Sequence, residues 1–197
     1  MTERLEIRVT GFGGQGVVLA AYIIGRACIH AGRHATMIQS FGPEARGASC
    51  SATLVVAPDE VLYPYIQRPH ILVAMSGDGY EKFRDELRPG GTLVYESDLV
   101  HPGEANAFGI PSTRIAETLR KPMVQNIVML GFIAAVTSIV PLEAMRDAVR
   151  DSVPTGTEEI NLQAFDAGAA YYAELVERRP GTETADLQEA IGQETVV

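Results

Sequence analysis

Short β-forming runs and one apolar helical segment alternate along the N-terminal part of the chain. Residues 5–10 (LEIRVT) alternate apolar and polar positions and are rich in β-forming residues, which predicts a strand. A glycine cluster, GFGGQG at residues 11–16, follows directly, and residues 17–31 then carry the apolar spacing of a helix. Residues 35–39 again favour a strand. This succession of strand, glycine loop, helix and strand indicates a βαβ unit with a right-handed crossover.

The alternation continues through the middle of the chain, which then becomes helical. Short β-branched runs between turn signals predict strands at 51–57, 71–75 and 92–96, and a weaker extended piece is expected at 105–110, before Pro111. Helical periodicity predicts helices at 78–87, 112–119, 123–140, 142–151 and 158–177. The expected architecture is a mostly parallel sheet with helices on both faces and a helical C-terminal half, that is, a Rossmann-like α/β fold.

Two C-terminal segments, residues 123–140 and 178–197, decide whether a membrane span is expected and where the domain ends. Residues 123–140 form the longest apolar region, but the uninterrupted apolar stretch at 127–136 is too short for a bilayer, since a spanning helix needs about 20 apolar residues. We therefore expect a helix buried in protein and no membrane span. Residues 178–197 are polar and lack an apolar stripe. The domain is accordingly predicted at 1–177, followed at 178–197 by a tail that is flexible or docks on a partner chain.

Composition narrows the classes of protein that the chain can belong to. With 197 residues it suits one domain, and its net charge of −9 argues against nucleic acid as a partner. The two cysteines cannot hold an iron–sulfur cluster, which usually takes four thiolates, and they do not suggest a secreted disulfide framework. The N-terminal residues lack the apolar stretch of a signal peptide, so a cytoplasmic location is expected.

Glycines 11, 13, 14 and 16 form a GxGxxG motif between a predicted strand and a predicted helix. Such glycines allow a tight turn and a close backbone approach, and they direct peptide N–H groups toward an anion at the helix N-terminus. The dinucleotide fingerprint also requires an acidic residue after the second strand, where this chain has Gln39 and Ser40. A nicotinamide site is therefore disfavoured. A phosphate or pyrophosphate contact and simple close packing of helix on strand both stay open.

The segment from Ser40 to Ser49 (SFGPEARGAS) should leave the carboxyl end of the second strand, where open α/β sheets bind their ligands. Glu44 and Arg46 carry opposite charges within one rigid turn. They could stabilise the loop through their own ion pair, form a subunit contact, or position the arginine for a phosphate or carboxylate. The residues alone do not choose between these.

Other chemically active residues give weaker signals. His30 and His34 are expected to be solvated rather than metal-binding, and Cys28 to lie in the core. Cys50 could be partly accessible, but it has no identifiable general base, so no catalytic residue and no metal ligand are assigned. We expect Asp78 to cap the helix that follows it. Two further expectations are a contact surface at Tyr63–Tyr65 and buried, hydrogen-bonded side chains at Asn126 and Asn161.

Three blocks in consistent order give the chain a family resemblance: GFGGQGVVLAAYIIGRA, IQSFGPEARGASCSATLVV and LYPYIQRPHILVAMS. They resemble the gamma subunit of the 2-oxoacid:acceptor oxidoreductases, whose members act on pyruvate, 2-oxoglutarate, 2-ketoisovalerate, indolepyruvate or phenylglyoxylate. The similarity continues through GGTLVYES, KPMVQN and EINLQAF and covers roughly residues 5–177.

The resemblance implies a heteromeric enzyme that oxidatively decarboxylates a 2-oxoacid to an acyl-CoA. It implies that alpha and beta subunits build a thiamine diphosphate site with Mg²⁺, and that beta or ferredoxin-like subunits hold the iron–sulfur clusters. Ferredoxin or NAD would be the final acceptor. The gamma chain would complete the assembly, bind no cofactor alone, and contribute to the coenzyme A side. Gly11, Gly13, Gly14 and Gly16 would shape a coenzyme A contact, and Glu44 and Arg46 would order a loop facing ligand or a neighbouring subunit.

Two other functions compete with this interpretation. A free-standing nucleotide-binding oxidoreductase could use the same glycine loop, although the missing acidic residue counts against it. A purely structural assembly subunit could use the glycines and the Glu44–Arg46 turn for packing alone. The sequence does not indicate which 2-oxoacid is used or how many copies of each subunit are present.

Overall fold

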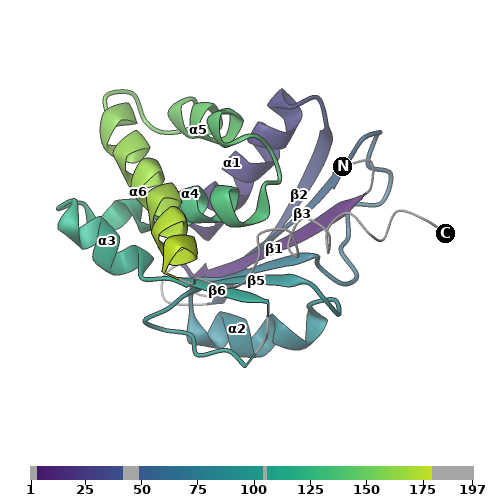
Figure 1. Cartoon of the computed structure of the whole chain (residues 1–197). Coiled ribbons are helices and arrows are strands. Elements are labelled where there is room, and N and C mark those ends of the chain that lie inside the picture. The colour runs from purple at the N-terminus through teal and green to yellow at the C-terminus, as the bar shows by residue number, and fades with distance from the viewer. Residues whose placement is uncertain (1–3, 42–48, 104–105, 179–197) are drawn as a thin grey trace.

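A six-stranded sheet with helices on both faces makes up the fold (Figure 1). The structure is a computed structural model and describes residues 4–41, 49–103 and 106–178. The strands are β1 (Leu5–Phe12), β2 (His34–Phe41), β3 (Ser49–Ala57), β4 (Ile71–Ala74), β5 (Thr92–Glu96) and β6 (Ala107–Ile110). The helices are α1 (Val17–His30), α2 (Gly77–Phe83), α3 (Ser112–Thr118), α4 (Gln125–Thr137), α5 (Leu142–Arg150) and α6 (Glu158–Glu177). Short 3₁₀ turns follow α2 at Arg84–Glu86 and precede α4 at Pro122–Val124.

The strand order is β2-β3-β1-β4-β5-β6. The pairs β1–β4, β4–β5 and β5–β6 are parallel, whereas β3 is antiparallel to both of its neighbours, β1 and β2. The predicted α/β class with a mostly parallel sheet is confirmed. The predicted βαβ unit differs in one respect: β2 has the same direction as β1, but β3 lies hydrogen-bonded between them.

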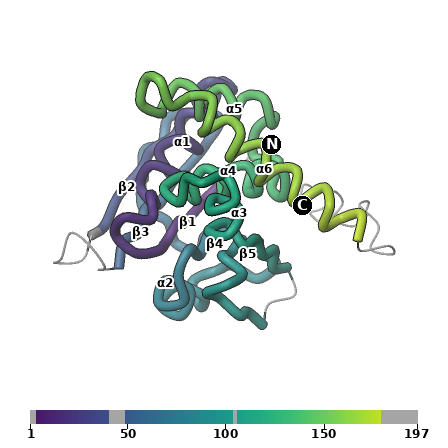
Figure 2. Tube along the Cα trace, turned by 90° about the vertical axis from the view of Figure 1, so that its left-hand side faces the viewer, coloured from purple at the N-terminus to yellow at the C-terminus, as the bar shows by residue number. Residues whose placement is uncertain are grey.

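Both faces of the sheet are covered, and the two coverings are unequal. Helices α1, α4, α5 and α6 lie on one side and α2 on the other, as two perpendicular views show (Figures 1 and 2). Strand β4 shows the consequence, since all four of its residues are buried. Ile71 and Val73 belong to the large core beneath α1 and α4, while Leu72 and Ala74 pack with Tyr80 and Phe83. A continuous apolar run is what a strand buried on both faces requires.

Helix α4 is the central helix of the large core. Its residues Asn126–Ala134 are all buried, which confirms the prediction of a helix buried in protein. The helix is shorter than predicted because Ser138 takes a left-handed conformation (φ 47°) and ends it. Within the described ranges, none of the helices combines the length and apolar character that crossing a membrane would take.

Helix α2 corrects one prediction about its N-terminus. Ser76, and not Asp78, is the N-cap residue, because its side-chain oxygen accepts a hydrogen bond from the N–H of Gly79 at 3.1 Å. Asp78 lies in the first turn of the helix instead. The helix begins one residue earlier than predicted, and the cap position moves with it.

The sheet has a topological switch point between β1 and β4, because the helices that follow these two strands, α1 and α2, lie on opposite faces. Strand β1 continues into α1 on one face, and its parallel neighbour β4 continues into α2 on the opposite face (Figure 1). Two adjacent parallel strands whose connections leave on opposite faces form a topological switch point, and open α/β sheets bind ligands at the carboxyl ends of such strands. The glycine loop at residues 11–16 follows β1 at this position.

Candidate functional site at the glycine loop

Gly14 is the most open residue of the glycine loop. Its φ of +102° lies in the left-handed region, which side chains rarely adopt, and a Cβ placed on it would meet no atom within 4 Å. The residue is also exposed. A glycine at this position is therefore required by the backbone conformation of the turn and not by close packing.

Gly11 and Gly16 are required for a different reason, namely close packing. A Cβ on Gly11 would lie 2.6 Å from Oε1 of Gln15 and 2.9 Å from Cγ2 of Val17. A Cβ on Gly16, which is the N-cap of α1 with φ +75°, would collide with the side chain of Asn126. The packing interpretation of the motif thus accounts for Gly11 and Gly16 but leaves Gly14 unexplained.

Gln15, which sequence reasoning missed, holds the loop in place. Its Oε1 accepts a hydrogen bond from the backbone N–H of Phe12 at 2.7 Å, and its Nε2 donates to the carbonyl of Met75 at 2.9 Å. Its own N–H donates to the carbonyl of Phe12 at 3.1 Å. The side chain therefore joins the end of β1 to the residue that follows β4, across the switch point. A long amide side chain inside the glycine motif was the available signal.

Asn126 anchors the loop from the other side. It is 4% exposed, and its Nδ2 donates to the carbonyl oxygen of Gly16 at 3.4 Å. This contact joins the start of α4 to the start of α1. Asn161 is also buried but lies elsewhere, with its Nδ2 donating to the carbonyl of Thr157 at 2.8 Å near the start of α6. Both asparagines are thus buried and hydrogen bonded, as expected.

The electrostatics at the start of α1 favour an anion. The first turn of this 14-residue helix, all of which the structure describes, contains no acidic residue. The first hydrogen bond of the helix runs from the N–H of Ala20 to the carbonyl of Gly16, so the preceding N–H groups lie outside the α-helical ladder. Unpaired N–H groups and the positive end of the helix dipole attract negative charge.

Glu96, at the carboxyl end of β5, is a second residue that sequence reasoning missed. It is 2% exposed, and its carboxylate accepts hydrogen bonds from the Ser112 hydroxyl at 2.5 Å and from the Thr113 N–H at 3.1 Å. Its other oxygen accepts from the N–H of Asp98 at 3.3 Å. The carboxylate therefore caps α3 and orders the turn after β5. This role is structural, and it explains why an acidic residue is tolerated in the interior.

Glu44 and Arg46 lie outside the described residues. The residues on either side of their segment are placed, however, since β2 ends at Phe41 and β3 begins at Ser49. Ser49 is paired with Phe12 and Cys50 with Gly11. The segment that carries Glu44 and Arg46 therefore begins and ends at the same edge of the sheet as the glycine loop.

The cysteines and histidines provide no nucleophile or ligand set. Cys50 is 5% exposed, so the expectation that it is partly accessible is wrong; it faces the core beneath α1. Burial raises the pKa of the Cys50 thiol, and burial raises that of Cys28 to about 11. His30 and His34 are exposed, as expected. Within the described residues, no group of His, Cys, Asp and Glu side chains is arranged to hold a metal ion.

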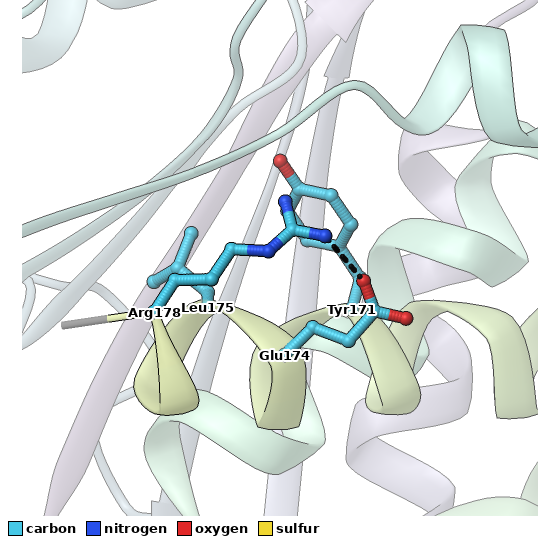
Figure 3. A pocket seen from close by; sticks show the side chains of 4 residues that line it. All are labelled: Tyr171, Glu174, Leu175 and Arg178. Carbon is cyan, nitrogen blue, oxygen red and sulfur yellow. Dashed lines mark hydrogen bonds and ion pairs between the residues drawn. The ribbon is translucent and has the colours of Figure 1, made fainter. Parts of the chain in front are cut away.

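Two surface hollows of the described part lie away from the glycine loop. One is lined by Tyr171, Glu174, Leu175 and Arg178, all from the end of α6, where Arg178 pairs with Glu174 at 3.1 Å (Figure 3). Another lies at the amino ends of β1 and β4 and is lined by Glu6, Gln67, Arg68, His70, Arg88 and Pro89. Neither contains a residue of the predicted site.

The segment expected to form a contact surface, Tyr63–Tyr65, has its backbone held in place by hydrogen bonds from Arg4. Tyr63 and Tyr65 are 53% and 57% exposed, and Leu62 is 87% exposed. Arg4 donates hydrogen bonds to the carbonyls of Tyr63 and Tyr65 at 2.9 and 2.8 Å, and it pairs with Glu6 at 3.0 Å. The aromatic side chains are thus presented outward on a fixed backbone. That they contact another chain stays a prediction.

Comparison with known proteins identifies the family. The sequence profile described as "Pyruvate ferredoxin/flavodoxin oxidoreductase" matches residues 6–171, which is most of the chain. The chain belongs to this family. Its resemblance to the 2-oxoacid oxidoreductases is thereby confirmed, and with it the prediction of an oxidoreductase subunit rather than a free-standing nucleotide-binding enzyme.

Individual relatives show which members the chain is similar to. It is 42% identical over 179 residues to the 2-oxoglutarate synthase subunit KorC of Methanocaldococcus jannaschii, covering 87% of this chain and 96% of that protein. The crystal structure of a keto/oxoacid ferredoxin oxidoreductase gamma subunit from Geobacter sulfurreducens matches with a TM-score of 0.72 and 32% identity, over 83% of this chain and 95% of that one. The ketoisovalerate oxidoreductase subunit VorA of Methanothermobacter thermautotrophicus is 31% identical, but only 37% of its length is covered.

These coverages describe two arrangements of the same domain within the family. In the KorC and Geobacter proteins it makes up nearly the whole chain, whereas VorA continues well beyond it.

Proposed function

We propose that this chain is the gamma subunit of a heteromeric 2-oxoacid:acceptor oxidoreductase that forms an acyl-CoA, and that its glycine loop contacts coenzyme A. In this proposal alpha and beta subunits hold thiamine diphosphate and Mg²⁺, and a ferredoxin-like subunit or the beta subunit holds the iron–sulfur clusters. Two cysteines in the whole chain are too few for a cluster of the common four-thiolate type. Ferredoxin or NAD is the final acceptor.

The observation that carries the coenzyme A contact is the conformation of Gly14. Gly14 has φ +102°, is exposed and has open space at its Cβ position, so packing within the chain does not require a glycine there. It lies two residues before Gly16, the N-cap of α1, where peptide N–H groups and the helix dipole attract an anion. Coenzyme A carries a 3′-phosphate and a diphosphate, either of which such a turn can accept.

Glu44 and Arg46 complete the proposed site. The ends of their segment, Phe41 and Ser49, lie at the same edge of the sheet as Gly11 and Phe12. An arginine close to this edge would supply a bidentate partner for a phosphate oxygen, and a neighbouring glutamate would fix its direction. The position of the segment's ends supports this part of the proposal.

The names of the most similar relatives suggest which 2-oxoacid to test first. Those at about 42% identity are named as subunits of 2-oxoglutarate synthase, and the ketoisovalerate and pyruvate relatives are more distant at 31% and 32%. 2-Oxoglutarate is therefore the first substrate to supply in an assay. Because the thiamine diphosphate site lies on other subunits in this proposal, the substrate is tested on the assembled enzyme.

The experiment compares two glycines that share a conformation but not a location. Gly14→Ala and Gly90→Ala both place a methyl group on a left-handed residue with open space around it, since Gly90 has φ +75° in the turn before β5. The variants are assembled with the partner subunits, and 2-oxoacid-dependent reduction of a viologen dye is measured against coenzyme A and 2-oxoacid concentration.

We expect Gly14→Ala to raise the KM for coenzyme A by about tenfold, equivalent to one lost charge-assisted hydrogen bond, and to leave the KM for the 2-oxoacid unchanged. Gly90→Ala should leave both constants as they are. Equal KM values for coenzyme A in the wild type and Gly14→Ala would favour the purely structural assembly subunit. Full 2-oxoacid oxidation by the chain without partners would contradict the subunit assignment itself.

A further inference from the structure

Gln15 occupies the place at which a ligand usually enters a doubly wound sheet. The switch point lies between the carboxyl ends of β1 and β4, and the carboxamide of Gln15 spans these two ends. Its Oε1 is so close to the end of β1 that a Cβ on Gly11 would lie 2.6 Å from it. The chain thus fills this part of the switch point with its own side chain.

The orientation of the carboxamide is fixed by its two partners. The Phe12 N–H can only donate and the Met75 carbonyl can only accept, so the oxygen must face Phe12 and the nitrogen must face Met75. Both polar atoms of the side chain are therefore used in holding the backbone, at 2.7 and 2.9 Å. Neither bond depends on a ligand, so the conformation of the loop is established before any ligand binds.

This arrangement determines which side of the loop a ligand can use. The inner side, toward β4, is closed by Gln15 and by its contact with Met75. At the start of α1, the Gly16 side is closed by Asn126. The outer side, at Gly14, is exposed and has no atom within 4 Å of the Cβ position. An anion therefore has access to the loop from outside the sheet and not from between the strands.

We propose that Gln15 is a positioning residue for coenzyme A: by joining Phe12 to Met75 it holds the turn at Gly13–Gly14 outward, so that a phosphate group of coenzyme A binds on its outer side. This proposal rests on the coenzyme A contact proposed above. It adds that the affinity of the loop for the phosphate depends on a side chain that does not touch it. In a mobile loop the same N–H groups would have to be ordered on binding, which lowers affinity.

Two substitutions separate the shape of Gln15 from its hydrogen bonds. Gln15→Met keeps the length of the side chain and fills the same space, but it can neither accept from Phe12 nor donate to Met75. Gln15→Ala removes both the hydrogen bonds and the filling. Gln163, an exposed glutamine on α6, provides the matched controls Gln163→Met and Gln163→Ala.

The variants are assembled with their partner subunits, and the KM values for coenzyme A and for the 2-oxoacid are measured together with kcat and the melting temperature. We expect both Gln15 variants to raise the KM for coenzyme A by about tenfold, with the KM for the 2-oxoacid and kcat at saturating coenzyme A within about twofold of the wild type. The Gln163 variants should match the wild type in all constants. Should Gln15→Ala fail to assemble, Gln15→Met, which keeps the packing, decides the matter.

The outcomes separate this proposal from the one on which it rests. If Gly14→Ala raises the KM for coenzyme A and neither Gln15 variant does, the positioning role is wrong while the coenzyme A contact stands. If no variant of Gly14 or Gln15 changes this constant, both proposals fail. A parallel rise of both KM values with a lowered melting temperature would show that Gln15 only stabilises the fold, and it would also overturn the positioning role.

Discussion

Gly131 of α4 and Gly168 of α6 each face the backbone of the other helix. A Cβ on Gly131 would overlap the carbonyl oxygen of Phe165, and a Cβ on Gly168 would overlap the carbonyl oxygen of Val128. The two helices therefore cross with their backbones in contact, at a separation that only glycine permits. This crossing holds α6 against the apolar helix that supports the glycine loop.

Substitution at this crossing should be among the most destabilising changes in the chain. Gly131→Ala and Gly168→Ala each force a methyl group against a helix carbonyl that cannot rotate away, and we expect each to lower the free energy of unfolding by about 3 kcal/mol. Gly103→Ala is the control, because a Cβ there meets open space. Thermal and urea unfolding of the full-length chain measure the difference. A loss below that of the control would mean that the helices can separate at little cost.

Gly16 and Asn126 should behave as a coupled pair. Gly16→Ala costs stability both because φ is +75° and because the new methyl group collides with the Asn126 side chain. Asn126→Ala removes the collision together with the bond to the Gly16 carbonyl. We expect the double variant to be about 1 kcal/mol more stable than the sum of the single effects predicts. Additive effects in a double-mutant cycle, measured by urea unfolding, would contradict the contact.

Glu96 should contribute to stability through its acceptor capacity. Glu96→Gln replaces one carboxylate oxygen by an NH₂ group, which cannot accept from the Ser112 hydroxyl and the N–H groups around it. We expect a loss of about 2 kcal/mol, the usual range for breaking buried hydrogen bonds to a charged group. Glu117→Gln, an exposed change on helix α3, whose N-terminus Glu96 caps, should be neutral. Urea unfolding of the two variants compares them directly.

The raised pKa of the Cys28 thiol predicts that the free energy of unfolding falls at alkaline pH. Burial raises the pKa of its thiol from 9.0 to about 11, so the unfolded chain loses this proton first as pH rises. The contribution of the protonated Cys28 thiol to the free energy of unfolding is fully present below pH 9. It is lost between pH 9 and 11, which lowers the free energy of unfolding by about 2 to 3 kcal/mol. Unfolding free energies measured at pH 8 to 11 should therefore fall more steeply for the wild type than for Cys28→Ala. Parallel curves would mean that the thiol ionises equally in both states.

The positions of the strands and helices could be predicted from the sequence because each has its own period. The strand at Thr92–Glu96 and the helix at Glu158–Glu177 have the expected bounds, and the others differ by a few residues at their ends. The direction of β3 was not predicted, since alternation of apolar and polar residues is the same in both directions. The short connection between Phe41 and Ser49 contained the relevant signal, because parallel neighbours need a crossover of a dozen or more residues.

The site was only partly predictable for a related reason. The spacing of the glycines makes their motif recognisable in the sequence. Gln15 and Glu96, in contrast, are single polar residues whose hydrogen-bond partners, Met75 and Ser112, are distant in sequence. Their roles arise from the packing of the sheet, which no local pattern encodes. The burial of Cys50 could not be predicted for the same reason. Cys50 follows a polar loop in the sequence, but in strand β3 it is paired with Gly11 and its side chain belongs to the core.

The anchors of the glycine loop also set the order in which it can be completed during synthesis. The motif itself spans residues 11–16, but its conformation depends on the carbonyl of Met75 and on the side chain of Asn126. A ribosome must therefore deliver the chain as far as α4 before the turn has both of its supports. A truncated chain that stops before residue 126 would contain every glycine of the motif and still lack the support that Asn126 gives the turn. The sequence signature and the functional loop are in this sense separate properties of the molecule, the first local and the second dependent on most of the domain.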